Sequence, residues 1–273
     1  MATTMDWQGE VGAHWAAQQA TFDHLLASVG EAGMAVLAPK EGERILDLGC
    51  GAGASTRALA ASGARATGVD ISPDLVALAR AAGGGPHYLQ GDAGTVDLDG
   101  PHDALFSRCG SMFFATPVLA LAHLRQALRP GARAVLVCWR DAAANPWIRV
   151  PLNAVSDLLG AAAAPAAPGA PGLFAWADPE VFLPILRDAG WEEISHTAHD
   201  VDVTLSHPGQ ADPVEAAIEA LTRVGPLRGR LADVDQATVA AVEEALRPVL
   251  AAHVDGDAVR LGAGLWIVTA RAP

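Results

Sequence analysis

The sequence predicts an α/β domain built on a doubly wound, mostly parallel sheet of seven strands, with helical cap insertions. Short apolar runs alternate with stretches of helical spacing through the first half of the chain, a pattern typical of such sheets. Ala132–Trp139 is apolar throughout, as expected of a strand with helices on both faces. Seven segments have strand character: residues 44–48, 66–70, 87–90, 103–107, 132–139, 193–205 and 264–271.

Helix signals separate or follow these strands. Ser72-Pro73, Thr116-Pro117 and Asp178-Pro179 each place a capping side chain before a proline at the first helical position. Amphipathic spacing predicts two more helices over residues 212–223 and 235–252. These two helices follow the alternating part of the chain, and we interpret them as an inserted cap.

The pattern divides the chain into segments. Lid helices are expected at the N-terminus, and the sheet core is interrupted by an insertion with an Ala/Pro/Gly-rich loop at 160–171 and later by the helical cap. The segments are 1–35 (lid), 36–139 (core), 140–177 (insertion), 178–205 (core), 206–258 (cap) and 259–273 (final core strand).

Composition limits the classes of partner. The 273 residues include 31 acidic and 18 basic side chains, which give a formal net charge of −13. This charge repels a phosphate backbone, and no Lys/Arg cluster offsets it locally, so we expect no nucleic-acid partner. No apolar run is long enough to span a membrane. The first ten residues do not resemble a secretory signal, and three scattered cysteines make no disulfide framework, so we expect a cytoplasmic compartment.

A glycine-rich turn follows the first strand. Gly49, Gly51 and Gly53 lie in ILDLGCGAGAST, residues 45–56, between a strand and a helix. Glycines permit a tight turn and close approach of the backbone to a ligand. Because Gly49, Gly51 and Ala54 also satisfy the relaxed pattern G-x-G-x-x-G/A, the spacing alone leaves NAD or FAD open.

Three aspartates at successive strand ends favour a different ligand. Asp47 precedes the turn by two residues, where a carboxylate repels a pyrophosphate but attracts the sulfonium and ammonium of S-adenosylmethionine. Asp70 ends the second strand, where an acid accepts ribose hydroxyls. Asp92 ends the third strand and can accept from the adenine amino group. Each aspartate has the alternative of capping the next helix, an alternative weakened by the alignment of all three with the turn.

Together these motifs resemble those of the class I S-adenosylmethionine-dependent methyltransferases. The most similar group is related to the bacterial quinone C-methyltransferases, and the resemblance implies a Rossmann-like fold. No Asn/Asp-Pro-Pro-aromatic tetrapeptide follows the fourth strand, so methylation of a flipped base is not expected. The matching segments are ILDLGCGAGAST (45–56), GVDIS (68–72), QGDA (90–93), DALFSRCGSMFF (103–114) and LRPGARAVLVCW (128–139).

The resemblance implies roles for the matched positions. S-adenosylmethionine would be the cofactor and S-adenosylhomocysteine the product. Ile71 would pack on adenine, Ser107 or Arg108 would face the aminocarboxylate, and Trp15 would lie on a lid helix that crosses the cofactor. The predicted cofactor-binding residues are Trp15, Asp47, Gly49, Cys50, Gly51, Gly53, Asp70, Ile71, Asp92, Ala93, Ser107 and Arg108.

We expect a small-molecule acceptor that is apolar or aromatic. Five of the seven tryptophans lie in or beside the lid and the first insertion, and an aromatic wall suits such an acceptor and a sulfonium. Filling the core is the alternative for each tryptophan. The predicted substrate-binding residues are Arg140, Asn145 and Trp147, where Arg140 would clamp a carboxylate or form a surface pair with Asp141.

Methyl transfer requires no particular catalytic side chain, because holding the nucleophile in line with the C–S bond supplies most of the acceleration. A general base is needed only where the acceptor loses a proton. His14 on the lid is our candidate base, with His207 as a second. We expect no metal site, since His196 and His199 would face opposite sides of a strand.

Three functions follow from these patterns, in order of preference. The first is methyl transfer from S-adenosylmethionine to O, N or C of a small molecule. The second is a cofactor-binding protein of the same fold with other chemistry, such as a cyclase, or with a regulatory role. The third is a NAD(P)-dependent oxidoreductase, which Asp47 and the lack of a second dinucleotide half disfavour.

Overall fold

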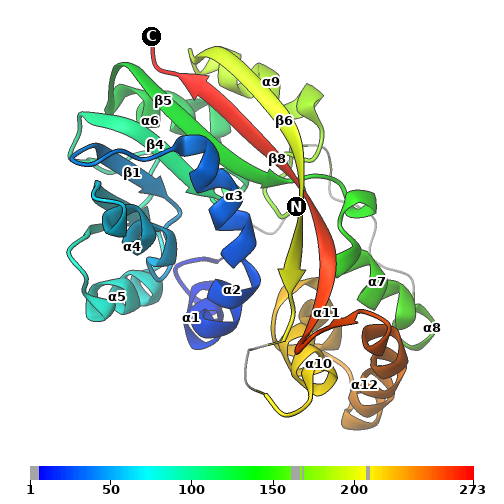
Figure 1. Cartoon of the computed structure of the whole chain (residues 1–273). Helices are drawn as coiled ribbons and strands as arrows, with labels where there is room; N and C mark the ends of the chain where they lie inside the picture. Colours follow the sequence, from blue (N-terminus) through cyan, green and yellow to red (C-terminus); the bar gives the residue numbers. More distant parts are fainter. Residues whose placement is uncertain (1–5, 161–166, 168, 207–209) are drawn as a thin grey trace.

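A single twisted sheet organises the molecule (Figure 1). The computed structural model describes residues 6–160, 167, 169–206 and 210–273. The strand order is β3-β2-β1-β4-β5-β8-β6, in which β1 to β5 are parallel and β8 runs antiparallel to both of its neighbours. The strands are β1 (Arg44–Leu48), β2 (Arg65–Asp70), β3 (His87–Gln90), β4 (His102–Arg108), β5 (Leu128–Trp139), β6 (Glu192–Thr204), β7 (Val254–Asp255) and β8 (Ala258–Arg271).

The seven predicted strands and the mostly parallel order are confirmed, but the last strand is longer than predicted. β8 begins at Ala258 rather than at Gly264, and the two-residue β7 pairs only with β8. Gly264 lies inside this strand because neighbouring backbone is very close to it. A Cβ at Gly264 would lie 2.7 Å from the carbonyl oxygen of Ala144, so only glycine permits this approach.

Helices cover both faces of the sheet, as the alternating pattern predicts. On one side α4 (Ala54–Ala61) packs on β1 and β2, α5 (Pro73–Ala82) on β2 and β3, and α3 (Ala27–Leu37) on β4, β5 and β6. On the other side α6 (Pro117–Gln126) packs on β5 and against α9 (Pro179–Asp188), which packs on β6. The apolar fifth strand is therefore buried from both faces.

Most predicted helix starts have the expected cap. Ser72, Asp178, Asp212 and Asp235 each accept a hydrogen bond from a backbone N–H in the first turn of the following helix. Thr116 makes no such bond, although α6 still begins at Pro117.

The remaining helices lie beyond the carboxyl ends of the parallel strands (Figure 1). The lid consists of α1 (Glu10–Ala17) and α2 (Gln19–Leu25). The insertion after β5 contains α7 (Pro146–Ala154) and α8 (Ser156–Leu159), and part of its predicted Ala/Pro/Gly-rich loop, 161–166 and 168, is outside the described residues. The cap contains α10 (Pro213–Arg223), α11 (Gly225–Leu231) and α12 (Gln236–Ala251). Two short 3-10 turns are η1 (Ser111–Phe113) and η2 (Ala142–Ala144).

α3 belongs to the sheet layer rather than to the lid, although most of it falls within residues 1–35. A Cβ at Gly33 would lie 2.4 Å from Cγ2 of Val137 and 2.9 Å from Cε2 of Phe106. The backbone of α3 thus touches the sheet directly, and the lid proper ends near Leu26. Within the described residues, no helix is both long and apolar enough to cross a membrane.

The contact at Gly33 predicts a stability change that opposes helix propensity. We expect Gly33→Ala to lower the free energy of unfolding by about 1–3 kcal/mol, because overpacking against Val137 outweighs the gain in helicity. Urea unfolding measures this change. The matched control is Gly229→Ala in α11, where a Cβ meets nothing within 4 Å and a gain of up to about 1 kcal/mol is expected. Equal effects of the two substitutions would contradict the packing described here.

Candidate functional site

The glycine turn lies between β1 and α4, at the carboxyl edge of the sheet. Gly49, Gly51 and Gly53 have φ angles of 65°, 55° and 82°, a region that L-residues with a Cβ rarely adopt. A Cβ at Gly49 would lie 2.9 Å from Cα of Gly110, so two loop backbones meet there. A Cβ at Gly51 meets nothing within 4 Å, which leaves this part of the turn open to a ligand.

Asp47 is buried directly beneath this turn. Its Oδ2 accepts hydrogen bonds from Ser55 Oγ at 2.7 Å and Thr56 Oγ1 at 2.6 Å, while Oδ1 is buried with no partner. Burial raises the pKa of Asp47 to about 6, against the opposing effect of the two hydroxyls. An unpartnered carboxylate oxygen in an apolar setting is costly unless a cation or donor approaches it.

Asp70 ends β2 and holds the turn from the other side. Its Oδ2 accepts from Gly51 N at 2.8 Å and its Oδ1 from Ser72 N at 2.9 Å. Burial raises the pKa of this carboxyl as well. Each oxygen retains a further lone pair for a hydroxyl donor, so the predicted ribose contact is compatible with these bonds.

The third aspartate has a different setting. Asp92 is exposed, and its Oδ1 accepts from Gly94 N at 2.8 Å within a turn, whereas no helix begins there for Asp92 to cap. Ala93 beside it is buried, and Ile71 after β2 is half-buried. The predicted adenine contacts of these three residues stay predictions.

The end of β4 closes the site opposite the turn. Ser107 Oγ donates to Leu48 O at 3.0 Å and accepts from Gly110 N, so it joins β1 to the β4 loop. Cys109 has a φ of 62°, an uncommon value for a residue with a side chain. A Cβ at Gly110 would lie 2.7 Å from Leu48 O, so the loop approaches β1 only with glycine at this position.

Arg108 turns toward the lid. Its Nη2 lies 3.7 Å from Asp23 Oδ1 of α2, and its Nη1 donates to Leu26 O at 3.4 Å. These contacts are long for a guanidinium that is only 13% exposed. Its charge still lowers the pKa of Asp47, so Arg108 remains part of the electrostatics of the site.

The lid lays aromatic side chains beside the strand ends. Trp15 stacks on Phe22 with ring centroids 3.5 Å apart, and Trp7 contacts both Trp15 and Phe113 edge-on. α1 also packs on the start of α5, where a Cβ at Gly12 would lie 2.5 Å from Ser72 Oγ. The lid therefore lies against the turn that contains Asp70.

His14, the candidate base, points from the lid to the cap. Its Nε2 lies 2.9 Å from the carbonyl oxygen of Arg223, at the end of α10. Burial lowers the pKa of His14, with a further contribution from the charge of Arg228. The second candidate, His207, is outside the described residues.

The three predicted substrate residues form internal contacts. Arg140 Nη1 donates to Asp200 Oδ1 at 2.9 Å, and its guanidinium lies 5.5 Å from the Trp266 ring centre, so its partner is Asp200 and not Asp141. Asn145 is fully buried, donates to three carbonyl oxygens and accepts from Trp147 Nε1 and Gly264 N. Trp147 is buried against Trp139. Because Asn145 and Trp147 have no free polar atom, we leave both out of the proposed acceptor site.

Several residues of the site were not singled out from the sequence. Ser55 and Thr56 hold Asp47, and Gly110 allows the two loops to meet. Tyr88 packs beneath the turn beside Cys50, where a Cβ at Gly53 would lie 2.5 Å from its hydroxyl oxygen. The Ser-Thr pair that begins two residues after Gly53 was the one available signal. No cluster of three or more possible metal ligands occurs in the part of the chain that the structure describes.

Comparison with known proteins agrees with this geometry. Residues 46–136 match the model of a methyltransferase domain. The demethylmenaquinone methyltransferase of Clavibacter sepedonicus is 29% identical over 185 residues, which cover 63% of this chain and 75% of that protein.

Two solved structures share the fold. A Haemonchus contortus phosphoethanolamine N-methyltransferase in complex with S-adenosylmethionine aligns over all of this chain and 60% of its own, with 16% identity and a TM-score of 0.55. The (4+2)-cyclase SpnF aligns over 97% of this chain and 96% of its own, with 18% identity and a TM-score of 0.55. At these identities the likeness shows the fold alone.

Residues 46–136 thus form a methyltransferase domain of the S-adenosylmethionine-dependent type, and the chain is similar over 63% of its length to a bacterial demethylmenaquinone methyltransferase. The residues present fit this cofactor. Asp47 has a buried oxygen without a partner, and the backbone at Gly51 is open above the turn. A cation at this position would satisfy the carboxylate, and no pyrophosphate is needed to explain the turn.

The buried Asp47 predicts a pH-dependent stability change. The folded-state pKa is raised from 3.8 to about 6, so the folded protein holds a proton that the unfolded chain releases between these values. The free energy of unfolding should therefore fall as pH rises from about 4 to 6. Asp47→Asn cannot ionise and so avoids this loss of stability. At pH 7.5 the free energy of unfolding of the variant should exceed that of the unsubstituted protein by up to roughly 3 kcal/mol, and the two values should converge below pH 4. Denaturant unfolding across this pH range measures it, with exposed Asp188→Asn as control. A difference that grows at low pH would contradict the assignment.

Asn145 predicts a loss of stability without a loss of cofactor binding. Asn145→Ala leaves buried donors and acceptors unpaired, so the free energy of unfolding should fall by roughly 1–3 kcal/mol. Thermal unfolding measures the stability, and calorimetry with S-adenosylhomocysteine should give an unchanged Kd. Asn153→Ala, at an exposed position of α7, is the control. A stable variant with weakened ligand binding would instead place Asn145 in the ligand site.

Proposed function

We propose that this protein transfers the methyl group of S-adenosylmethionine to a small-molecule acceptor with an aromatic or otherwise apolar face. The observation that carries the proposal is the buried, half-satisfied carboxylate of Asp47 beneath an open glycine turn. The methyltransferase relatives support the same chemistry. The overall negative charge opposes a nucleic-acid acceptor, and three free cysteines fit the cytoplasm that we propose as its compartment.

The chain's residues divide the work of holding the cofactor. Asp47 would face the sulfonium and ammonium, and Asp70 would accept from the ribose hydroxyls while it holds Gly51. Arg108 and the β4 loop would border the methionine carboxylate. The cofactor supplies an activated methyl group whose C–S bond breaks with both electrons going to sulfur.

The acceptor would lie against the aromatic residues of the lid. Trp7, Trp15 and Phe22 form one continuous aromatic cluster with Phe113, a few residues past the end of β4. An aromatic surface favours a flat apolar acceptor and also the sulfonium. The relative from Clavibacter sepedonicus, named for demethylmenaquinone, supports an acceptor of aromatic character.

His14 would remove the proton where the acceptor nucleophile carries one. Since a carbonyl oxygen only accepts, the Nε2 that contacts Arg223 O must carry hydrogen, and Nδ1 is left as the basic nitrogen of the neutral ring. The lowered pKa of His14 keeps the ring neutral at pH 7. A nucleophile that is already unprotonated would need no base.

Binding of the cofactor product is the first test of this proposal. We expect S-adenosylhomocysteine to bind the purified protein in calorimetry, and NAD not to bind. Asp70→Ala should weaken binding at least tenfold, because it removes the ribose acceptor and the bond to Gly51 N. Asp99→Ala, an exposed position away from the turn, is the matched control. A preference for NAD, or no binding of either compound by folded protein, would overturn the proposal.

Turnover separates methyl transfer from other chemistry on the same fold. The fold likeness to the cyclase SpnF makes this test necessary. Formation of S-adenosylhomocysteine from S-adenosylmethionine in the presence of aromatic acceptors is expected. Tight cofactor binding with no turnover across phenols, reduced quinones, aromatic amines and aromatic amino acids would favour a non-methylating or regulatory role.

A further inference from the structure

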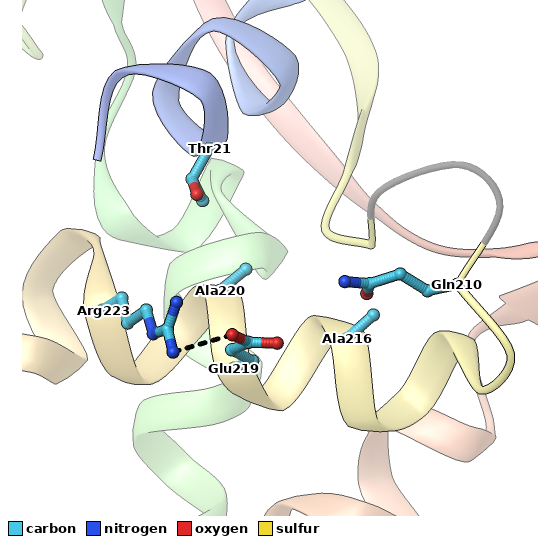
Figure 2. A pocket seen from close by; sticks show the side chains of 6 residues that line it. All are labelled: Thr21, Gln210, Ala216, Glu219, Ala220 and Arg223. Atoms are coloured by element: carbon cyan, nitrogen blue, oxygen red, sulfur yellow. Dashed lines mark ion pairs between the residues drawn. The ribbon is translucent and has the colours of Figure 1, made fainter. Parts of the chain in front are cut away.

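A cavity of about 210 Å³ lies between lid helix α2 and cap helix α10. Figure 2 shows Thr21 projecting from α2 toward α10, with Ala216 and Ala220 on the opposite wall and Gln210 at one end. The alanines are small and buried, so they leave space where larger side chains would fill the gap between the helices.

Two opposite charges complete the lining. Arg223 Nη2 lies 2.8 Å from Glu219 Oε1, one turn earlier on α10 (Figure 2). The side chains of Arg223 and Glu219 are 56% and 47% exposed. Exposed ion pairs within a helix contribute only about 0.3–0.5 kcal/mol, so a ligand can separate the two side chains at little cost.

The pairing of these charges selects the class of ligand. A carboxylate beside Arg223 can accept two parallel hydrogen bonds from the guanidinium, and an ammonium beside Glu219 replaces the bond that Glu219 loses. A ligand with only a carboxylate leaves Glu219 without a partner, and a ligand with only an ammonium leaves Arg223 without one. A purely hydrocarbon group would remove water from both charged side chains without replacing their hydrogen bonds. We propose that the cavity binds a zwitterionic group, with an ammonium and a carboxylate on one carbon as in an α-amino acid.

The position of the cavity connects it to the acceptor site. Thr21 immediately precedes Phe22, whose ring stacks on Trp15, and the carbonyl oxygen of Arg223 contacts His14. Lid helix α2 therefore carries both Phe22 of the aromatic cluster and Thr21 of the cavity wall, and α1 carries Trp15 and His14 beside them. Combined with the proposed function, on which this step rests, the acceptor is an aromatic amino acid or a close derivative of one.

The test compares three probes of nearly equal size by calorimetry. L-phenylalanine carries both charges, 2-phenylethylamine lacks the carboxylate, and 3-phenylpropanoate lacks the ammonium. We expect L-phenylalanine to bind at least tenfold more tightly than either of the others, both to the free protein and to protein mixed with S-adenosylhomocysteine. Equal affinities, or no binding of L-phenylalanine to folded protein, would overturn the proposal.

Variants of the cavity assign the two charges. Arg223→Gln should weaken the binding of L-phenylalanine and leave the affinity for 2-phenylethylamine unchanged. The contact of His14 with the backbone oxygen of residue 223 is kept in this variant, so the lid is not disturbed. Glu219→Gln should weaken L-phenylalanine and leave 3-phenylpropanoate unchanged. Ala220→Met fills the space without removing a charge and should weaken all three probes, with circular dichroism as the check on folding.

The matched controls are the partners of another ion pair on the cap. Glu215 of α10 pairs with Arg247 of α12 at 2.6 Å, with exposures of 49% and 39%, and neither side chain lines the cavity. Glu215→Gln and Arg247→Gln should therefore leave all three affinities unchanged. If the control substitutions lower the affinities as much as the substitutions at Glu219 and Arg223, the effect of charge is non-specific. That result would contradict the proposed binding site.

The outcomes for the cavity and for the proposed function are separable. Binding of S-adenosylhomocysteine without selective binding of L-phenylalanine would reject the cavity and keep methyl transfer. Selective binding of L-phenylalanine without any binding of S-adenosylhomocysteine would keep the cavity and reject the proposed function.

Discussion

The burial of one carboxylate constrains the whole cofactor edge. Asp47 is 1% exposed, and its ionised form is costly in such a setting. The hydroxyls of Ser55 and Thr56 offset part of that cost, which requires α4 to begin directly after the glycine turn. The turn is consequently short and has three residues at positive φ. The same tight turn brings Gly49 against Gly110, so the loops after β1 and β4 meet and define the site.

The second constraint is how lid and cap join around that edge. β6 and β8 continue beyond the end of β5 as a two-stranded ribbon that supports the cap helices. Side chains of the lid and of the first turn of α3 then contact carbonyl oxygens of this region: His14 with Arg223, His24 with Ser206 and Ser28 with Asp202. In all three bonds the acceptor is a backbone oxygen, so these bonds do not depend on which side chains the cap carries. Those side chains are free to differ, and at Glu219 and Arg223 they supply charge to the cavity.

Polar residues near the strand ends divided into two groups that looked alike in the sequence. Asp47 and Asp70 face the turn, and their unused lone pairs remain compatible with a ligand. Asn145 stands at an equally suggestive position after β5, yet its amide bonds only to the protein and ties the start of α7 to β8. Local sequence does not distinguish these cases, because the difference depends on whether another strand's backbone comes within hydrogen-bond reach.

The parallel core, the glycine turn and the aspartates at the strand ends could all be predicted from local patterns in the sequence. These features depend on short-range causes: the alternation of apolar runs, capping residues and the need for glycine at positive φ. The length of β8, the place of α3 in the sheet layer, the partner of Arg140 and the cavity between α2 and α10 were decided only by the tertiary structure. Each of these joins segments far apart in the chain, and contacts of that kind leave no periodic signal in either segment. The physical reason is that tertiary packing depends on how well two distant surfaces fit together, whereas secondary structure depends on the residue types within one segment.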